Sequence, residues 1–508
     1  MTLGKVLPLE ELKKVVGSLK ADGKRVIHCH GVFDLLHIGH IHHFEESKAL
    51  GDVLVVTVTP DQYVNKGPHR PAFPEALRAQ TISSLGVVDY VAVNEWPTAE
   101  ETLRLLHPDV YSKGAEYRER QVDADQNLLP EVEVTRELGI EVAFTGDGVV
   151  FSSSELLNRH LSGLSPEADA WLDDLRRRYS SEDVIRWLDS LQQKSALVVG
   201  EAIIDEYVYC SAIGKSTKDP VLACQYNDTE AYAGGSIAVA NHVAGFCNEV
   251  TLVTYLGEED RHEDFVRDSL RPNVKSVFIT KSGAPTVRKR RFVEPIMQTK
   301  LLELYVMDDR PMSGADEQSL QDALRSHQKG HDLTIVADYG HGLMTPGAIE
   351  TICEGGGFLA VNAQSNAGNR GFNPISRYPR ADYVCLAQHE IMIETRMRDA
   401  PIRDLLKEVA QRISCSQFTV TRGKFGSLHY TAEEGFTEVP AFASKVVDRV
   451  GAGDGFLSLS SLLLSQGAPW DIIGLAGNVA GAQIVAELGN RKPLERVATS
   501  KHIISLMK

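Results

Sequence analysis

The stretch that decides the fold of the N-terminal half is Gly31-Val-Phe-Asp-Leu-Leu-His-Ile-Gly-His40. It follows a β-branched run, 25–30, and precedes a segment with helical character, 41–50. A strand that ends on a glycine and continues into a helix directs backbone N–H groups toward one rim, together with His37 and His40. We therefore expect a phosphate-bearing ligand to bind at this turn.

The composition limits the classes of function that the chain can have. Its 508 residues exceed one ordinary core, and 43% hydrophobic and 24% charged residues are typical of a globular protein. The net charge of −16 argues against nucleic acid and anionic membranes as partners, with the basic run 288–291 as a local exception. The 7 cysteines show no C-x-x-C spacing, and the sequence shows no signal peptide or membrane-spanning run. These features predict a cytoplasmic protein.

Strand-like and helix-like segments alternate through the first 160 or so residues after a short amphipathic helix at 10–20. The strand-like runs are 25–29, 53–59, 88–93, 109–112 and 140–144, and the helix-like runs are 40–50, 74–85, 98–106 and 129–138. Such alternation predicts a parallel sheet with crossover helices, which binds ligands beyond the carboxyl ends of its strands. We assign this first domain to residues 1–162.

A helical linker and a second α/β domain are expected after the first domain. Gly163-Leu-Ser-Pro166 breaks the chain, and apolar residues then recur at helical spacing through a predicted linker, 163–194. The second domain, 195–508, again alternates strands with helices, and a β-rich stretch at 207–232 is predicted to form a small lid. Its other predicted strands are 251–256, 333–338, 358–362, 383–386 and 417–421.

Residues in the first domain suit transfer of a nucleotidyl group from an NTP to a phosphate. His37 and His40 are three residues apart, so they face one side of a helix start, and Gly39 lets a phosphate approach the backbone. The reaction needs in-line positioning and donors for the developing charge, without a protein nucleophile. Two alternatives remain open: a metal cluster, or histidines that fill a polar surface. The crowded histidines are His28, His30, His37, His40, His42 and His43.

Gly31-x-Phe33-Asp34-x-x-His37-x-Gly39-His40 resembles the signature of the HxGH nucleotidyltransferases. The order of the later motifs is most similar to the adenylyltransferase domain of bifunctional heptose kinase/adenylyltransferases. The resemblance implies a Rossmann-like domain in which His37 and His40 hold the β- and γ-phosphates, and Lys66 and Lys113 neutralise the triphosphate or the acceptor phosphate. It assigns nucleotide binding to Gly31, Phe33, Asp34, Gly39, Lys66, Arg78, Ser152, Ser153 and Ser154, and catalysis to His37, His40 and Lys113.

A second glycine-rich turn, Val447-Asp448-Arg-Val-Gly451-Ala-Gly-Asp454, joins a strand-like segment to a helix. The small residues Gly451, Ala452 and Gly453 would form an anion hole of backbone amides at a helix N-terminus. Asp454 would stand where it can take a proton from an attacking hydroxyl group. Kinase chemistry needs these parts, although a plain glycine-rich turn with a capping aspartate is the alternative.

Further motifs make the second domain similar to the ribokinase-like carbohydrate kinases over residues 195–490, and above all to the heptose-phosphate kinases. The motifs are Gly234-Gly235-x-x-Ala238-Val-Ala-Asn241, Thr421-Arg-Gly423-x-x-Gly426 and Gly477-Asn478. The resemblance implies that Asp454 is the catalytic base. It places the sugar against Asp205, Gly234, Gly235 and Asn241, the nucleotide against Thr421, Gly423, Gly426, Gly451, Ala452, Gly453 and Asn478, and further substrate contacts at Lys289 and Arg291.

The chain departs from the heptose enzymes in three ways. The kinase-like domain follows the nucleotidyltransferase-like domain, which reverses the order of those enzymes. His341 and Gln364 stand where their motifs have lysine, and a neutral side chain does not restore the lost positive charge. Arg288, Lys289 and Arg291 are the residues expected to compensate.

We therefore expect a bifunctional enzyme that phosphorylates a sugar or sugar phosphate, such as a heptose 7-phosphate, and then forms a nucleotide-activated sugar. The resemblance implies Mg²⁺ bound with ATP or another NTP, allows a monovalent cation, and predicts a homodimer through the kinase domain. No metal site made by the protein alone is expected. The alternative is a cytidylyltransferase whose kinase-like half binds a sugar or nucleotide and serves for dimerisation.

Overall fold

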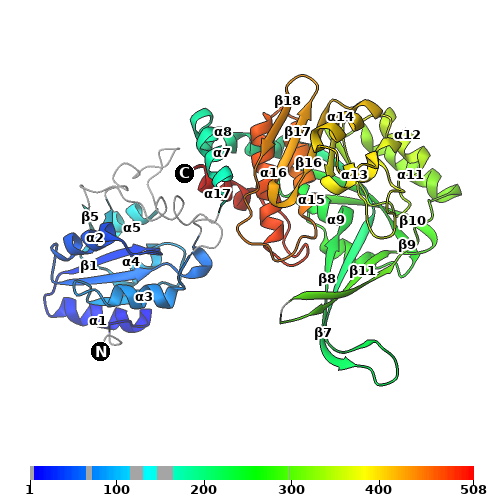
Figure 1. Cartoon of the computed structure of the whole chain (residues 1–508). Coiled ribbons are helices and arrows are strands. Elements are labelled where there is room, and N and C mark those ends of the chain that lie inside the picture. The colour runs from blue at the N-terminus through cyan, green and yellow to red at the C-terminus, as the bar shows by residue number, and fades with distance from the viewer. Residues whose placement is uncertain (1–4, 65–70, 115–129, 146–163, 297) are drawn as a thin grey trace. The chain divides into compact units, whose positions relative to one another are not determined.

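A computed structural model describes the chain except for residues 1–4, 65–70, 115–129, 146–163 and 297 (Figure 1). The chain divides into two compact units, Met1–Ser162 with Lys508, and Gly163–Met507. Each unit has its own sheet and its own hydrophobic core, so we describe them separately.

The first unit contains a parallel five-stranded sheet with the order β3-β2-β1-β4-β5. Its strands are β1 (Val26–Gly31), β2 (Val53–Val58), β3 (Tyr90–Val93), β4 (Val110–Gly114) and β5 (Glu141–Thr145). Its helices are α1 (Leu9–Ala21), α2 (Ile38–Lys48), α3 (Glu75–Ser83), α4 (Glu100–Leu106) and α5 (Pro130–Leu138), with the short turn η1 (Asp61–Tyr63). Every residue of β2 is buried, as its run of valine and leucine predicts for a parallel strand covered on both faces.

The strand order of this sheet reverses between β1 and β4, since the chain moves from β1 out to β3 and returns to β4. An open parallel sheet binds ligands outside the carboxyl ends of its strands at such a reversal. The turn between Gly31 and α2 leaves β1 at that point. The topology therefore places the quoted stretch where ligand binding is expected.

The second unit is built on a nine-stranded sheet with the order β10-β9-β6-β13-β14-β15-β16-β17-β18. Its strands are β6 (Ser195–Gly200), β9 (Glu249–Glu259), β10 (Val274–Pro285), β13 (Leu333–Asp338), β14 (Phe358–Ala363), β15 (Tyr383–Ala387), β16 (Gln417–Thr421), β17 (Ser427–Thr431) and β18 (Gly435–Val439). The two last strands are antiparallel to their neighbours, and the other pairs are parallel. The order reverses at β6, so the carboxyl ends of β6 and β13 mark the second expected site.

Helices surround this sheet (Figure 1). They are α7 (Pro166–Arg178), α8 (Ser181–Ser190), α9 (Gly235–Ala244), α10 (Glu263–Ser269), α11 (Gly314–Gln328), α12 (Pro346–Glu354), α13 (Gln388–Thr395), α14 (Ile402–Arg412), α15 (Ala452–Leu464), α16 (Trp470–Val485) and α17 (Arg496–Met507). The short turns are η3 (Leu191–Gln193), η4 (Ile375–Arg377) and η5 (Gly423–Phe425). Every residue of α9 and nearly every residue of α15 is buried, which explains their apolar sequences.

The predicted linker forms α7 and α8, and these helices pack on the second unit. Leu172, Leu175, Val184 and Leu188 are all buried in the hydrophobic core of that unit. Ser180 starts α8 with a reciprocal capping box to Asp183, which satisfies backbone donors at the helix start. The apolar residues at helical spacing in this segment therefore contribute to a core.

A separate four-stranded sheet, which we call the lid sheet, stands beside the main sheet of this unit (Figure 1). Its order is β12-β11-β7-β8, with β7 (Ala202–Lys215), β8 (Leu222–Gly234), β11 (Val287–Glu294) and β12 (Thr299–Val306). The lid predicted at 207–232 corresponds to β7 and β8, while β11 and β12 add a second pair of strands. The predicted α/β fold class is confirmed, with a parallel N-terminal sheet and a second α/β unit that carries a small β lid.

Across the described ranges, no helix combines the length and the hydrophobicity that crossing a membrane requires.

Candidate functional site

The N-terminal candidate site is built around the start of α2. His37 is the N-cap residue, and its Nδ1 accepts a hydrogen bond of 3.1 Å from the backbone N–H of Gly39. The rings of His37 and His40 have centroids 4.0 Å apart, and Phe33 meets His40 edge-on at 5.4 Å. The two histidines thus share one side of the helix start, as their spacing predicts, at the end where backbone N–H groups favour an anion.

Three of the other histidines form side-chain hydrogen bonds within the first unit. The Nε2 of His28 lies 2.7 Å from Thr57 Oγ1, the Nδ1 of His30 lies 2.9 Å from the same hydroxyl, and His43 is bonded to Thr145. Burial lowers the pKa of His30 and of His43 to about 4, so both are neutral at pH 7. Within the described residues, no group of three or more His, Cys, Asp or Glu side chains could hold a metal ion, and the histidine cluster has no support as a metal site.

Asp34 and Arg78 brace the loops of this site from inside the protein. Asp34 accepts hydrogen bonds from the backbone N–H groups of Ala72 at 2.6 Å and Phe73 at 3.2 Å. The Arg78 side chain is only 1% exposed, and it donates to the carbonyl oxygens of Phe73, Val32 and Thr59 and to the carboxylate of Asp61. This geometry favours a positioning role for both residues over the direct nucleotide contact that the resemblance implies.

Lys113 stands at the end of β4 in a small charged cluster. Its ammonium group lies 2.5 Å from Glu131, which also accepts a hydrogen bond of 3.0 Å from the hydroxyl of Tyr111. Burial raises the pKa of Glu131, but the charge and the hydrogen bond of Lys113 outweigh it and the net shift is downward. Lys66 and Ser152–Ser154, the remaining predicted residues of this site, lie outside the described residues.

The second unit contains a cavity of about 410 Å³ at the carboxyl ends of its parallel strands. Its lining brings together residues that are far apart in the sequence. The predicted site residues among them are Asp205, Gly235, Lys289, Arg291, Thr421, Gly451, Gly453 and Asp454. The volume suits a small-molecule ligand.

Asp454 lies in the first turn of α15, directly behind the glycine-rich turn. Its Oδ1 accepts a hydrogen bond of 2.9 Å from the hydroxyl of Tyr339, and the backbone N–H of Tyr339 is held by Glu201 at 2.9 Å. Burial raises the pKa of Asp454 to about 7, against the hydrogen bond from Tyr339 and with a further contribution from the charge of Asp205. A carboxylate with a pKa near neutrality suits a general base.

The opposite wall of the cavity carries a buried ion pair from the lid sheet. Arg291 donates to Asp205 at 2.5 Å and to Glu303 at 3.1 Å, and both members of the Arg291–Asp205 pair are almost completely buried. A Cβ atom at Gly234 would lie 2.1 Å from Asp205 Oδ2, so a glycine is required for this approach. Lys289 lies beside the pair over the Tyr305 ring, at 5.5 Å, and burial lowers its pKa.

The turn that precedes Asp454 is fixed from both sides. Gly451 has φ +81°, and a Cβ atom there would lie 1.9 Å from the side-chain oxygen of Asn490. Asp448 accepts hydrogen bonds from Lys300 Nζ and from the hydroxyl of Tyr207, both at 2.7 Å. Strands β12 and β7 of the lid sheet are thereby joined to the turn that would cradle a phosphate.

Some of the remaining predicted residues of the second unit lie at the cavity, and others form contacts elsewhere in the fold. Thr421 lines the cavity, and Gly423 and Gly426 form the tight turn after it. Asn241 lies elsewhere: its side chain donates to the carbonyl of Ser269 at 2.8 Å and accepts from the N–H of Arg271 at 2.9 Å. Asn478 donates to Ser427 at 2.9 Å, outside the lining of this cavity. These contacts favour structural roles for Asn241 and Asn478. Ala452 is the first residue of α15.

The two positions that lack the expected lysine differ in their surroundings. Gln364 lines the cavity, whereas His341 is buried behind it with Nδ1 2.8 Å from Asp309 Oδ1. The ammonium group of Lys281 donates to the carbonyl oxygen of His341 at 3.1 Å. A lysine from β10 therefore brings a positive charge close to the position where the resemblance expects one.

Comparison with known proteins fits both halves of the chain. A model of the pfkB family of carbohydrate kinases matches residues 193–496, which is more than half of the chain. The chain belongs to the pfkB family. A cytidylyltransferase-like model matches residues 28–159, so this pfkB member carries a nucleotidyltransferase-like region before its kinase region. The predicted fusion of the two domain types is confirmed.

Similar proteins include two bacterial relatives, each called bifunctional protein HldE. The one from Desulfatibacillum aliphaticivorans is 38% identical over 155 residues, 30% of each chain. The one from Rhodopseudomonas palustris strain BisA53 is 28% identical over 305 residues, 58% of this chain and 61% of the relative. Each match therefore spans less than two thirds of the length of the relative.

Solved structures show the same fold for the kinase unit of this pfkB member. The tetrameric inhibited form of Escherichia coli phosphofructokinase-2 has a TM-score of 0.50 at 16% identity, and covers 62% of this chain and 100% of its own. The same enzyme in complex with potassium has a TM-score of 0.50 at 17% identity, with 62% and 99% covered. At these identities the likeness concerns the fold.

The sequence motifs missed several residues of the pfkB cavity. Tyr339 and Glu390 line it, and Asn490 completes the turn at Gly451. Burial raises the pKa of Glu390 to about 7, against hydrogen bonds from the backbone of Ala387 and Ser365. Tyr339 directly follows β13, so its position at a strand end was the signal that could have identified it, whereas Glu390 lies in the first turn of α13 and Asn490 in the segment between α16 and α17.

Proposed function

We propose that the chain is a bifunctional enzyme that makes a nucleotide-activated sugar. The C-terminal unit would phosphorylate a sugar or a sugar phosphate with ATP, and the N-terminal unit would transfer a nucleotidyl group, adenylyl in preference, to the resulting sugar 1-phosphate. The domain order would be the reverse of that in the heptose enzymes. The HldE relatives and the two family matches support this pairing of activities.

The observation that carries the kinase proposal is the environment of Asp454. The carboxylate lies in the cavity at the start of α15, held by Tyr339, and its pKa is raised to about 7. In the proposed step, the sugar hydroxyl oxygen attacks the γ-phosphorus of ATP, its proton passes to Asp454, and ADP leaves. The N–H groups after Gly451 would stabilise the charge on the transferred phosphoryl group.

The cavity favours a sugar that already carries a phosphate. Arg291 is bound to both Asp205 and Glu303, whereas the Lys289 ammonium group lines the cavity over the Tyr305 ring, with the charges of Asp205, Glu201 and Asp454 acting on it. Burial lowers the pKa of Lys289 more than these carboxylates raise it, so an anionic group of a ligand would stabilise its charged form. We propose that Asp205 and the backbone at Gly234 and Gly235 hold the sugar hydroxyls, and that Lys289 holds its phosphate.

The nucleotidyl transfer would take place at the start of α2. An oxygen of the sugar 1-phosphate attacks the α-phosphorus of the NTP, and pyrophosphate leaves with the electrons of the broken P–O bond. His37 and His40 stand at the helix N-terminus, where they would bind the β- and γ-phosphates with the N–H of Gly39 nearby. Lys113 would neutralise the acceptor phosphate, and Lys66 and Ser152–Ser154 would complete the nucleotide site.

Mg²⁺ fits both reactions as a companion of the NTP, since it is usually bound through one or two carboxylates together with substrate phosphates. In the kinase cavity, Glu390 is a buried carboxylate besides Asp205 and Asp454, and it would hold the ion either directly or through water. When bound, the ion would neutralise charge that develops on the phosphates.

The decisive experiment is an assay of Asp454→Asn for ATP-dependent sugar phosphorylation. We expect kcat to fall by at least about a hundredfold, because a general base contributes roughly that factor or more. Asp404→Asn, an exposed aspartate of α14, is the matched control and should keep wild-type activity. Unchanged turnover in Asp454→Asn would refute the assignment of the base.

The alternative function is a cytidylyltransferase whose kinase-like unit only binds a sugar or nucleotide and dimerises. The observation that favours it is that Gln364 and His341 stand where the resemblance expects lysine, because the fixed charge of a lysine is then missing from the phosphate region. A wild-type protein that phosphorylates no sugar in a broad panel, yet releases pyrophosphate from CTP, would support this alternative.

We also propose that the chain forms a homodimer through the lid sheet. Large apolar side chains are exposed on its strands, including Leu222 at 56%, Tyr226 at 64% and Leu302 at 59%. Exposed apolar side chains that gather on one small sheet mark a protein–protein contact. Sedimentation velocity of the full chain measures this directly, and a monomer at micromolar concentration would contradict it.

A further inference from the structure

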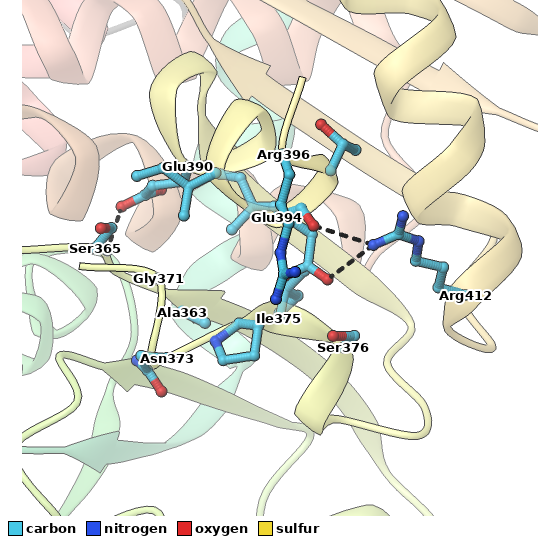
Figure 2. Close-up of a pocket in the computed structure, with 14 residues that line it drawn as sticks. Ala363, Ser365, Gly371, Asn373, Ile375, Ser376, Glu390, Glu394, Arg396 and Arg412 are labelled. Atoms are coloured by element: carbon cyan, nitrogen blue, oxygen red, sulfur yellow. Dashed lines mark hydrogen bonds and ion pairs between the residues drawn. The ribbon is translucent and has the colours of Figure 1, made fainter. Parts of the chain in front are cut away.

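A second cavity of about 360 Å³, which we call the α13 pocket, lies next to the kinase cavity (Figure 2). It is bounded by α13, by the loop after β14 and by Arg412 of α14. The residues that matter for its chemistry are Ser365, Asn373, Glu390, Glu394, Arg396 and Arg412. None of them belongs to the sugar and nucleotide contacts assigned to the kinase reaction, except that Glu390 and Ser365 line both cavities.

The pocket contains a buried carboxylate that the protein satisfies only in part. The Glu394 side chain is 4% exposed, and its Oε1 lies 3.7 Å from Arg412 Nη1. Its Oε2 is buried and has no hydrogen-bond partner. The guanidinium group of Arg412 donates hydrogen bonds to the carbonyl oxygen of Glu394, at 3.0 Å, and to the carboxylate of Glu408. A buried oxygen left without a donor costs about 1–3 kcal/mol or more, so a ligand that donates an O–H group there would be stabilised.

The pocket is also lined by the exposed cation of Arg396. Arg396 follows α13, and Figure 2 shows its side chain running down into the pocket beside Glu394 and Ile375. In the described part of the chain, no ion pair or hydrogen bond is recorded for its guanidinium group. Its backbone has φ +59°, a conformation that costs an arginine roughly 1–2 kcal/mol relative to glycine. A planar guanidinium group matches the oxygens of a phosphate.

We infer that the α13 pocket binds a small hydroxylated phosphate ester, with its phosphate on Arg396 and a hydroxyl group on Glu394 Oε2. The volume lies at the lower end of the range for ligand sites, which favours a sugar or polyol phosphate over a nucleotide. Ser376 lines the same pocket and offers a further hydrogen bond to a hydroxyl group.

Binding in this pocket would act on the kinase cavity through their common wall. Glu390 is one helical turn before Glu394 on α13, and its carboxylate accepts hydrogen bonds from Ser365 N–H at 3.0 Å and Ala387 N–H at 2.7 Å. A ligand against Glu394 therefore bears on the helix that fixes both Glu390 and the backbone of the cavity wall. This regulatory part of the inference rests on the proposed kinase activity, whereas binding does not.

Calorimetric titration of the full chain with glycerol 3-phosphate tests the inference, with glycerol, glycerate and inorganic phosphate as separate probes. We expect Arg396→Met to weaken binding of glycerol 3-phosphate by at least about tenfold, since a charge-assisted bidentate contact is lost. Arg398→Met, on the exposed segment two residues away, is the matched control and should bind as wild type. Glu394→Gln should weaken the ester but not inorganic phosphate.

The outcomes separate this inference from the proposed function. Equal affinity of wild type and Arg396→Met, or no heat with any probe, would overturn the inference whatever the kinase does. Tighter binding of glycerate than of the ester would assign the pocket to a carboxylate and overturn the phosphate class. If wild type binds the ester and Arg396→Met does not, the ligand should change the KM of the kinase in wild type alone. An inactive kinase with that binding pattern would leave the pocket established and refute only the proposed function.

Discussion

Asp454 is buried, although its proposed role as a base requires a charged carboxylate. Its titration therefore affects the stability of the folded protein. Its pKa in the folded state is raised from 3.8 to about 7, first of all by burial. The folded protein therefore holds this proton more tightly than the unfolded chain. The contribution to stability is fully present below the unfolded pKa and is lost as the pH rises through the folded pKa.

Asp454→Asn should therefore become more stable than wild type as the pH rises from 5 to 8. The difference in the free energy of unfolding should grow by at most about 1.4 kcal/mol for each pH unit between the two pKa values. Urea unfolding followed by circular dichroism at several pH values measures it, with Asp404→Asn as the control. A difference that stays flat with pH would show that Asp454 is ionised in the folded protein throughout this range.

At the scale of elements, the lid sheet shows what sequence pattern can and cannot predict. The predicted lid corresponds to β7 and β8, whereas no strands were predicted at β11 and β12, although Lys289 and Arg291 of β11 were expected substrate contacts. In the structure β11 alternates buried and partly buried residues, with Lys289 and Arg291 on the inner face. A strand that turns its charged residues inward, toward Asp205 and a cavity, has the composition of a surface segment. Only the tertiary partners identify it.

Strand β12 also supplies a contact that we expect to matter for turnover. Lys300 reaches Asp448, whose side chain is 4% exposed, at the head of the turn leading to Gly451. The pKa of Asp448 is lowered because Lys300 and Tyr207 outweigh the effect of burial. Removing the ammonium group would leave this carboxylate short of a partner and loosen the turn that cradles the phosphate.

Lys300→Met should lower the kinase kcat by on the order of tenfold with a smaller change in KM for the sugar, because the turn acts on the transition state. Added ammonium ions should restore part of the rate by taking the empty place beside Asp448. Steady-state kinetics with and without ammonium chloride provide the measurement. Lys275→Met, which breaks only the exposed pair with Glu249, should behave as wild type in both conditions. A loss that ammonium does not relieve at all would indicate a lost packing contact instead.

At the scale of the whole molecule, strand periodicity and glycine-rich turns predicted two α/β units, and the fold follows them closely. The same turns located the two candidate sites. Gly31–His40 begins at the end of β1, whereas Gly451–Asp454 follows a loop, where a strand-like segment was predicted, and begins α15. The sequence did not predict which groups form hydrogen bonds inside the protein. Asn241, Arg78 and Asp34 are polar residues near motifs, and in the structure their partners include backbone groups of the protein itself.

The division into two units, each with a complete core, predicts two activities that fail separately. His40→Ala should reduce pyrophosphate release by about a hundredfold or more, since it removes a donor to charge that develops in the transition state. The kinase rate of this variant should equal that of wild type, because Asp454 and its cavity lie within the other unit. His42→Ala, on the same helix but exposed and paired with Glu45, is the matched control for the first unit.

The reciprocal variant completes the test. Asp454→Asn should release pyrophosphate at the wild-type rate when it is supplied with a sugar 1-phosphate and an NTP, yet make no product from the unphosphorylated sugar. The two assays share one protein preparation, and circular dichroism confirms that each variant is folded. If either substitution lowered both activities in a folded protein, the sites would depend on one another and the separate cores would not explain the chemistry. If each substitution lowers only one activity, the first site receives its acceptor only as free sugar phosphate. A sugar 1-phosphate supplied to His40→Ala should then remain unchanged.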